Sequence, residues 1–193
     1  VVVVSMIALF GTTHTSANAV ANTLDSIGII TGQAVGLAMI TVVGQCIGAH
    51  DTDQAVYYIK KLMLWTYSVM GVAHTLVLIF VKQLVGLYSS LSPETAQLAT
   101  TLVQIHSVAA IILWPAAFTL PNALRAANDV KFTMIVSIAS MILWRVSFSY
   151  ILCVNMQLGA IGVWIAMIID WVCRTSFFVG RVLSGKWKTK YTD

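Results

Sequence analysis

Long continuous runs of apolar residues, separated by short polar connections, dominate the chain. After a first apolar stretch at 1–10, the runs cover approximately 18–49, 62–81, 97–124, 132–153 and 159–180. A helix needs roughly 20 apolar residues to cross the hydrocarbon core of a bilayer, whereas barrel strands would show short alternating segments. The pattern therefore predicts an all-α, polytopic transmembrane helix bundle with about five full spans plus the end of a sixth.

The composition supports this prediction. Of 193 residues, 59% are hydrophobic and 9% are charged, and the mean hydropathy is +0.87. A soluble domain carries roughly 25% charged residues, so this chain has too few charges for a water-facing surface. The chain opens with Val1 inside an apolar run. We therefore expect 1–10 to be the tail of a helix whose beginning is missing, in a C-terminal fragment.

Lysine and arginine are unevenly divided between the connections. Alternate connections and the C-terminal tail together hold eight of them: Lys60, Lys61, Arg125, Lys131, Arg181, Lys186, Lys188 and Lys190. The other connections hold Lys82 alone. The positive-inside rule places the basic set in the cytoplasm, so 181–193 is expected to be a cytoplasmic basic tail. This bias accounts for the net charge of +4, and no nucleic-acid partner is expected.

Two prolines lie in the apolar run at 97–124. Pro115 and Pro121 each remove a backbone donor and leave one carbonyl without its usual partner. Lipid cannot satisfy such a carbonyl, so the broken turns are expected to face other helices or a wet cavity. We interpret both prolines as hinge positions, with Arg125 anchoring the inner end of the helix beside Asn128 and Asp129.

Ionisable side chains inside the spans are the candidate site residues, because each is costly in a membrane unless it is paired or hydrated. Asp25 lies two turns into the first full span, and His106 should lie at a similar depth in the proline-containing span. An Asp–His pair facing a cavity would bind and release protons near neutral pH. Trp114, which can stack on an aromatic cation, and Asn122 complete the predicted substrate- or ion-binding set.

Asp170, near the middle of the last span, is expected to belong to a structural ion pair. Its partner is either Arg174, one turn further along the same helix, or Arg145, at comparable depth in the preceding antiparallel span. No metal-ligand spacing, phosphate loop, dinucleotide fingerprint or nucleophile motif is present in the sequence. We therefore expect no metal, no cofactor and no enzyme activity.

Three stretches together resemble the multidrug and toxic compound extrusion (MATE) family. They read VVGQCIGAHDTDQA, LPNALRAANDVKFTMIVSIASMILWRVSFSYIL and LGAIGVWIAMIIDWVCRTSFF. The resemblance implies that 1–193 is the C-terminal half of a twelve-helix antiporter, holding the end of helix 7 and then helices 8–12. It also implies export of organic cations or drugs in exchange for protons or sodium ions, by alternating access across a bacterial plasma membrane.

Some members of the family carry an acid in helix 10 that joins the cation site, but residues 97–124 hold no carboxylate. A sodium site of that kind is therefore not expected, and the coupling ion stays open between proton and sodium. The expected partners are small organic cations, the lipid bilayer and the N-terminal half of the same chain. A lipid-linked oligosaccharide flippase of the same superfamily is the alternative function. A membrane enzyme such as an acyltransferase and a purely structural subunit are the other classes considered.

Overall fold

The computed structural model describes residues 2–189. Five of its helices are long and apolar enough to cross a membrane, and they cover Gly11–Gly48, Thr52–Gly86, Pro93–Ala126, Val130–Asn155 and Gly159–Leu183. A short helix, α1 (Val2–Ala8), precedes them. The described residues contain no strand. The prediction of an all-α bundle with five full spans and the end of a sixth is confirmed.

Three of the spans are single helices: α2 (Gly11–Gly48), α3 (Thr52–Gly86) and α8 (Gly159–Leu183). The third span consists of α4 (Pro93–Trp114), the π-helical turn η1 (Pro115–Thr119) and α5 (Leu120–Ala126). The fourth span consists of α6 (Val130–Ser140), η2 (Met141–Val146), α7 (Ser147–Ser149) and η3 (Tyr150–Asn155). A short 3-10 helix, η4 (Lys186–Thr189), follows α8. Residues 190–193 of the expected basic tail lie outside the described residues.

Polar residues fix where the helices begin. The Asp51 side chain accepts a hydrogen bond from the Gln54 amide at 2.9 Å, and α3 starts one residue after Asp51. Ser92 accepts from the Thr95 amide at 3.2 Å, and Pro93 occupies the first turn of α4. A side-chain oxygen before the first turn satisfies a donor that the helix itself leaves unpaired, and proline suits the first turn because it has no amide to donate.

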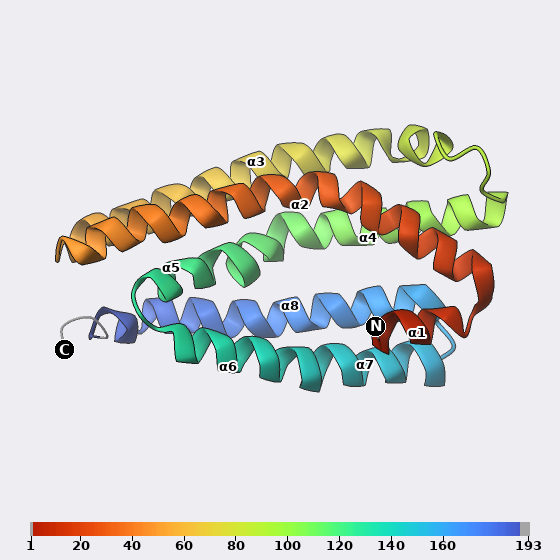
Figure 1. Ribbon diagram of the computed structural model, residues 1–193. Coiled ribbons are helices and arrows are strands. Elements are labelled where there is room, and N and C mark those ends of the chain that lie inside the picture. Colours follow the sequence, from red (N-terminus) through yellow and green to blue (C-terminus); the bar gives the residue numbers. More distant parts are fainter. Residues whose placement is uncertain (1, 190–193) are drawn as a thin grey trace.

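The helices form two layers (Figure 1). One layer holds α2, α3 and α4, which run side by side, and the other holds α8 with the chain from α6 to η3. The segment α5 passes from the first layer toward the second, and α1 lies between them against α8. Leu64, Ile79, Ile112 and Leu143 are among the many large apolar side chains exposed on the outside. Such a surface suits lipid and not water.

The proline-containing span continues as a helix through both prolines. Pro115 begins η1, where the chain follows a π-helical turn, and the Leu120 amide donates to the Pro115 carbonyl. Pro121 lies in the first turn of α5. At Pro115 the expected break in the helix is thus accommodated by a wider, π-helical turn. The helix bends there without an interruption (Figure 1).

Candidate functional site

Asp25 on α2 and His106 on α4 meet inside the first layer. The carboxylate Oδ1 lies against the imidazole Nδ1 as an ion pair. Asp25 is 5% exposed and His106 is 1% exposed, so neither charge is hydrated by bulk water. A buried carboxylate is tolerated when a partner of opposite charge or a hydrogen-bond donor faces it.

Rings from two further helices enclose His106. The indoles of Trp164 and Trp171 on α8 contact it edge-on, with centroid distances of 5.1 and 4.9 Å. The ring of His74 on α3 lies 6.2 Å away, centroid to centroid. His74 Nδ1 is 3.4 Å from the Ser107 hydroxyl, and the buried Nε2 atom has no hydrogen-bond partner among residues 2–189. Four helices therefore surround one carboxylate and two imidazoles.

Small residues on α2 make room for this arrangement. A Cβ added at Gly28 would come within 2.5 Å of His74 Nε2, and one at Gly36 would come within 2.7 Å of Asn122 Nδ2. A Cβ at Gly32 would meet Met70 and Trp114. These glycines let the neighbouring helices approach α2 closely, as small residues do in membrane bundles.

The ion pair of the last span forms within α8. Arg174 Nε donates to both carboxylate oxygens of Asp170, at 3.0 and 3.1 Å, and Arg174 Nη2 donates to the Ser137 carbonyl at 3.1 Å. The Ser140 hydroxyl also donates to Asp170. Arg145, the other candidate partner, forms no ion pair within residues 2–189 and borders a cavity of about 430 Å³ instead. The two alternatives for Asp170 are thus resolved in favour of Arg174.

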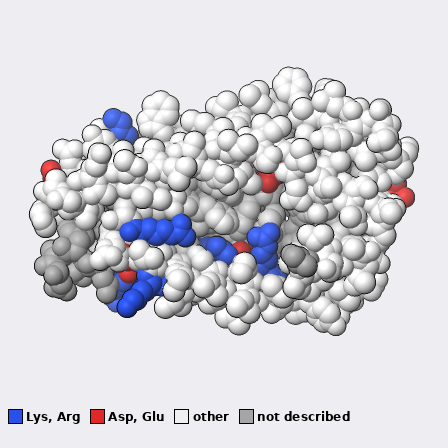
Figure 2. Space-filling model, viewed as in Figure 1, with Lys and Arg blue, Asp and Glu red and all other residues white. Residues whose placement is uncertain are grey.

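This cavity lies in the furrow between the two layers, next to α1. Asn18, Asn22 and Trp164 line it together with Arg145, and Trp164 Nε1 donates to Asn18 Oδ1 at 2.9 Å. Figure 2 shows this face hollowed between the layers, with basic and acidic atoms inside the hollow. It also shows basic atoms toward the end that carries the C-terminus.

The remaining predicted site residues belong to the third span. Trp114 is 5% exposed and stacks on Phe118 at 5.2 Å, so the ring fills space between helices. Asn122 is half-buried, and its Oδ1 accepts from Arg125 Nη1 at 2.9 Å. Arg125, which was expected to anchor the inner end of this helix together with Asn128 and Asp129, bonds one turn back to Asn122 on its own helix.

Asp129 binds Arg181 at the start of the second layer. Arg181 Nε and Nη2 donate to its two oxygens at 2.7 and 3.2 Å, and the guanidinium lies 4.7 Å from the centre of the Phe132 ring. Sequence reasoning missed this pair and also missed His74. A histidine within an apolar run was the available signal for His74, since an ionisable residue in a span needs a reason to be there.

The buried group of Asp25, His106 and His74 brings one carboxylate and two imidazoles together inside the first layer. Imidazole is the side chain whose charge changes near neutral pH, and one carboxylate compensates one positive charge.

Comparison with known proteins shows to which family the chain belongs. An uncharacterized transporter of Bacillus subtilis (strain 168), YisQ, is 29% identical over 150 residues, which are 75% of this chain and 31% of that protein. The probable multidrug resistance protein NorM of Thermotoga maritima is 22% identical over 167 residues, 86% of this chain and 36% of that protein. The probable multidrug resistance protein YoeA of Bacillus subtilis is 25% identical over 165 residues, 86% of this chain and 35% of that protein. The chain spans about a third of the length of these curated relatives.

The MatE family model matches residues 1–151, well over half of the chain. The chain therefore belongs to the MatE family of multi-pass membrane transporters, as the sequence resemblance predicted.

Proposed function

We propose that this chain is part of a secondary antiporter that exports organic cations or drugs in exchange for protons, and that Asp25 and His106 carry the exchanged proton. Two relatives are named as probable multidrug resistance proteins, which supports this substrate class. The observation that carries the proposal is the burial of a carboxylate–imidazole pair between two membrane-spanning helices.

The exchange follows from the charge of this pair. When the pair has lost its proton it bears a net charge of −1, and a substrate cation nearby is stabilised. When a proton binds, the attraction is lost and the cation is released. Proton and substrate thus compete for one negative charge, and competition of this kind couples their opposite movements.

A proton suits this site better than a sodium ion. Hard cations are bound by several oxygen atoms, but the groups around His106 are two indole rings and a second imidazole. No further carboxylate is available from residues 97–124 of the third span.

We further propose that the end of the bundle with the basic residues faces the cytoplasm of a bacterium. Arg181 and Lys188 lie at that end, as do the first part of α3, which holds Lys60, and the start of α6, which holds Lys131. This distribution agrees with the positive-inside rule. The π-helical turn at Pro115 would act as the hinge of the third span, since such turns bend a helix at low cost.

The test uses cells that express the full-length gene and accumulate ethidium. The Asp25→Asn variant should lose gradient-driven export, whereas Asp53→Asn, which alters an exposed carboxylate in the first turn of α3, should keep it. A protonophore should abolish export by the unmodified protein, and replacement of external sodium by choline should not. Full export by Asp25→Asn would refute the role of Asp25 in carrying the exchanged proton. Loss of export in choline would show that sodium, and not the proton, is the coupling ion.

The position of Arg145 favours the alternative function, a flippase for lipid-linked oligosaccharides. Its guanidinium borders the furrow cavity without an ion pair in the described residues, and a pyrophosphate would attract it. Arg174 contributes little to such a site because Asp170 neutralises it. Export of ethidium that is unaffected by Arg145→Gln would count against the flippase.

A further inference from the structure

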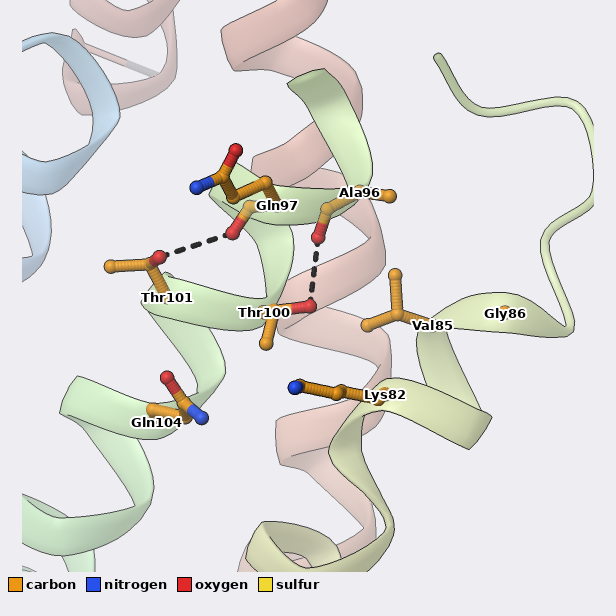
Figure 3. Close-up of a pocket in the computed structure, with 8 residues that line it drawn as sticks. All are labelled: Lys82, Val85, Gly86, Ala96, Gln97, Thr100, Thr101 and Gln104. Atoms are coloured by element: carbon orange, nitrogen blue, oxygen red, sulfur yellow. Dashed lines mark hydrogen bonds between the residues drawn. The ribbon is translucent and has the colours of Figure 1, made fainter. Parts of the chain in front are cut away.

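A depression of about 610 Å³ lies between the end of α3 and the start of α4. Its polar lining residues are Lys82, Gln97, Thr100, Thr101 and Gln104, and Val85, Gly86 and Ala96 complete the lining. Figure 3 shows the Lys82 side chain reaching from α3 toward α4, on the side where Thr100 and Gln104 lie. The depression opens at the end of the bundle away from the C-terminus, where the loop from α3 to α4 lies.

We expect water and not lipid to fill this depression, because lipid cannot form hydrogen bonds with its polar side chains. Gln104 is exposed, and it lies roughly 16 Å along α4 from Pro93 at 1.5 Å per residue, well inside an apolar span. An amide at that depth needs partners, and the hydroxyls of Thr100 and Thr101 already donate to carbonyls of their own helix, at 2.8 and 3.0 Å. Water is the partner that such a group takes in a cavity at membrane depth.

A line of polar residues runs from the depression toward the buried site. Thr100, Gln104 and Ser107 are spaced by four and three residues, so they share one face of α4. The line ends at the Ser107 hydroxyl, 3.4 Å from His74 Nδ1. His74 lies 6.2 Å from the centre of the His106 ring, which carries the pair with Asp25.

We propose that this line is the route by which protons from the outer side reach Asp25 and His106, with His74 as the last carrier. The proposal rests on the proposed function, and it adds to it the route with Gln104, Ser107 and His74. Ser107 is fully buried and does not line the depression, so water must first enter past Gln104 as α3 moves relative to α4. Hydronium then gives a proton to the Ser107 oxygen, and Ser107 gives its own hydroxyl hydrogen to His74 Nδ1. Only O–H and N–H bonds change, and the hydronium becomes water.

The ionisable groups that face His74 agree with this role. Asp25 on α2 and His106 on α4 are its charged neighbours, while α8 contributes the indoles of Trp164 and Trp171 around His106. Lys82 lies two turns further out on the same helix as His74. The imidazoles are not in hydrogen-bond contact at 6.2 Å, so the final transfer waits for a movement of α3 relative to α4, which gates the route.

The first experiment uses the full-length protein in proteoliposomes with an imposed pH gradient and ethidium as the transported cation. Substrate–substrate counterflow is measured in parallel, because exchange of ethidium for ethidium needs no proton. Ser107→Ala and Gln104→Leu should slow gradient-driven transport by about tenfold or more and leave counterflow unchanged. Ser176→Ala, which changes an exposed serine of α8, is the matched control.

The outcomes separate the two proposals. If Ser107→Ala and Gln104→Leu transport as fast as the control under the gradient, the route is wrong while the proposed function stands. If the unmodified protein ignores the gradient, or Asp25→Asn still responds to it, the proposed function itself fails.

If either variant folds poorly, thiol labelling tests whether water from the outer side reaches Gln104. In a version with Cys46, Cys153 and Cys173 replaced by alanine, Gln104→Cys should react with a membrane-impermeant methanethiosulfonate added from outside. Ile79→Cys, at an exposed apolar position of α3, should not. Equal labelling of the two positions, or labelling of Gln104→Cys only from the inside, overturns the route.

Discussion

Replacement of Gly28 by alanine tests the close approach of α2 and α3 on which the buried site depends. The added Cβ would lie 2.5 Å from both Cε1 and Nε2 of His74 and 2.9 Å from Cδ2. Ordinary contact begins near 3.4 Å, so the imidazole must retreat by roughly 0.9 Å in a position where it is fully buried.

The expected loss of stability has two parts. Overpacking of this kind costs about 1–3 kcal/mol. The His74–Ser107 contact, already 3.4 Å long, would break as the ring retreats and would cost about 1 kcal/mol more. Relative to Gly44→Ala, which gains the same helix propensity, the free energy of unfolding should therefore be lower by about 2–4 kcal/mol. At roughly 2 °C per kcal/mol for domains of this size, the Tm should fall by about 4 °C or more.

Thermal unfolding of the full-length protein in detergent measures this difference. Gly44→Ala is the matched control, since a Cβ there meets nothing within 4 Å and alanine favours a helix over glycine by about 1 kcal/mol. Equal melting temperatures for the two variants would show that α3 does not lie against Gly28 as described, and the placement of His74 would fall with it.

Three further changes test other parts of the molecule. Arg174→Ala leaves the Asp170 carboxylate buried without its partner and should destabilise the protein by about 3–5 kcal/mol, whereas the double variant with Asp170→Asn should recover most of the melting temperature. Pro115→Ala should reduce ethidium export more than it reduces the amount of folded protein in the membrane, and equal transport per folded molecule would remove the hinge. Asp129→Asn should lower the melting temperature because it weakens a bidentate bond to Arg181, and an unchanged value in thermal unfolding would contradict that pairing.

The spans and the depth of the first ionisable pair could be predicted from the sequence. Continuous apolar runs determine where helices cross the membrane, and residues counted from the ends of those helices placed Asp25 and His106 at one level. These inferences needed only the period and length of a helix, which are the same in every membrane protein. For Asp170 the sequence offered two partners, Arg174 at a spacing of four on the same helix and Arg145 in the preceding span, and only the structure selects Arg174.

The partners of other residues depended on how each helix is rotated against its neighbours. His74 faces Gly28 only because α2 carries small residues on that side, and no spacing in the sequence relates the two helices. Asp129 and Arg181 are 52 residues apart, and only the antiparallel fold of the second layer unites them. The prolines indicated a disturbed helix, but the π-helical turn that accommodates Pro115 depends on packing in three dimensions.

The fourth and fifth spans are joined by the Arg181–Asp129 ion pair and by the bonds from Arg174 to the Ser137 carbonyl and from Ser140 to Asp170. The Asp170–Arg174 pair itself lies within α8, and the Arg174 guanidinium also lies 5.4 Å from the centre of the Phe118 ring in the third span.

Toward the first layer, α8 offers Trp164 to Asn18 and Thr175 to the Leu113 carbonyl, at 2.9 and 3.4 Å. Breaking a neutral hydrogen bond costs about 1 kcal/mol, and breaking a buried charged pair costs about 3–5 kcal/mol. The hairpin of the fourth and fifth spans should thus keep the bonds between its own two helices more readily than its hydrogen bonds to α2 and to the third span.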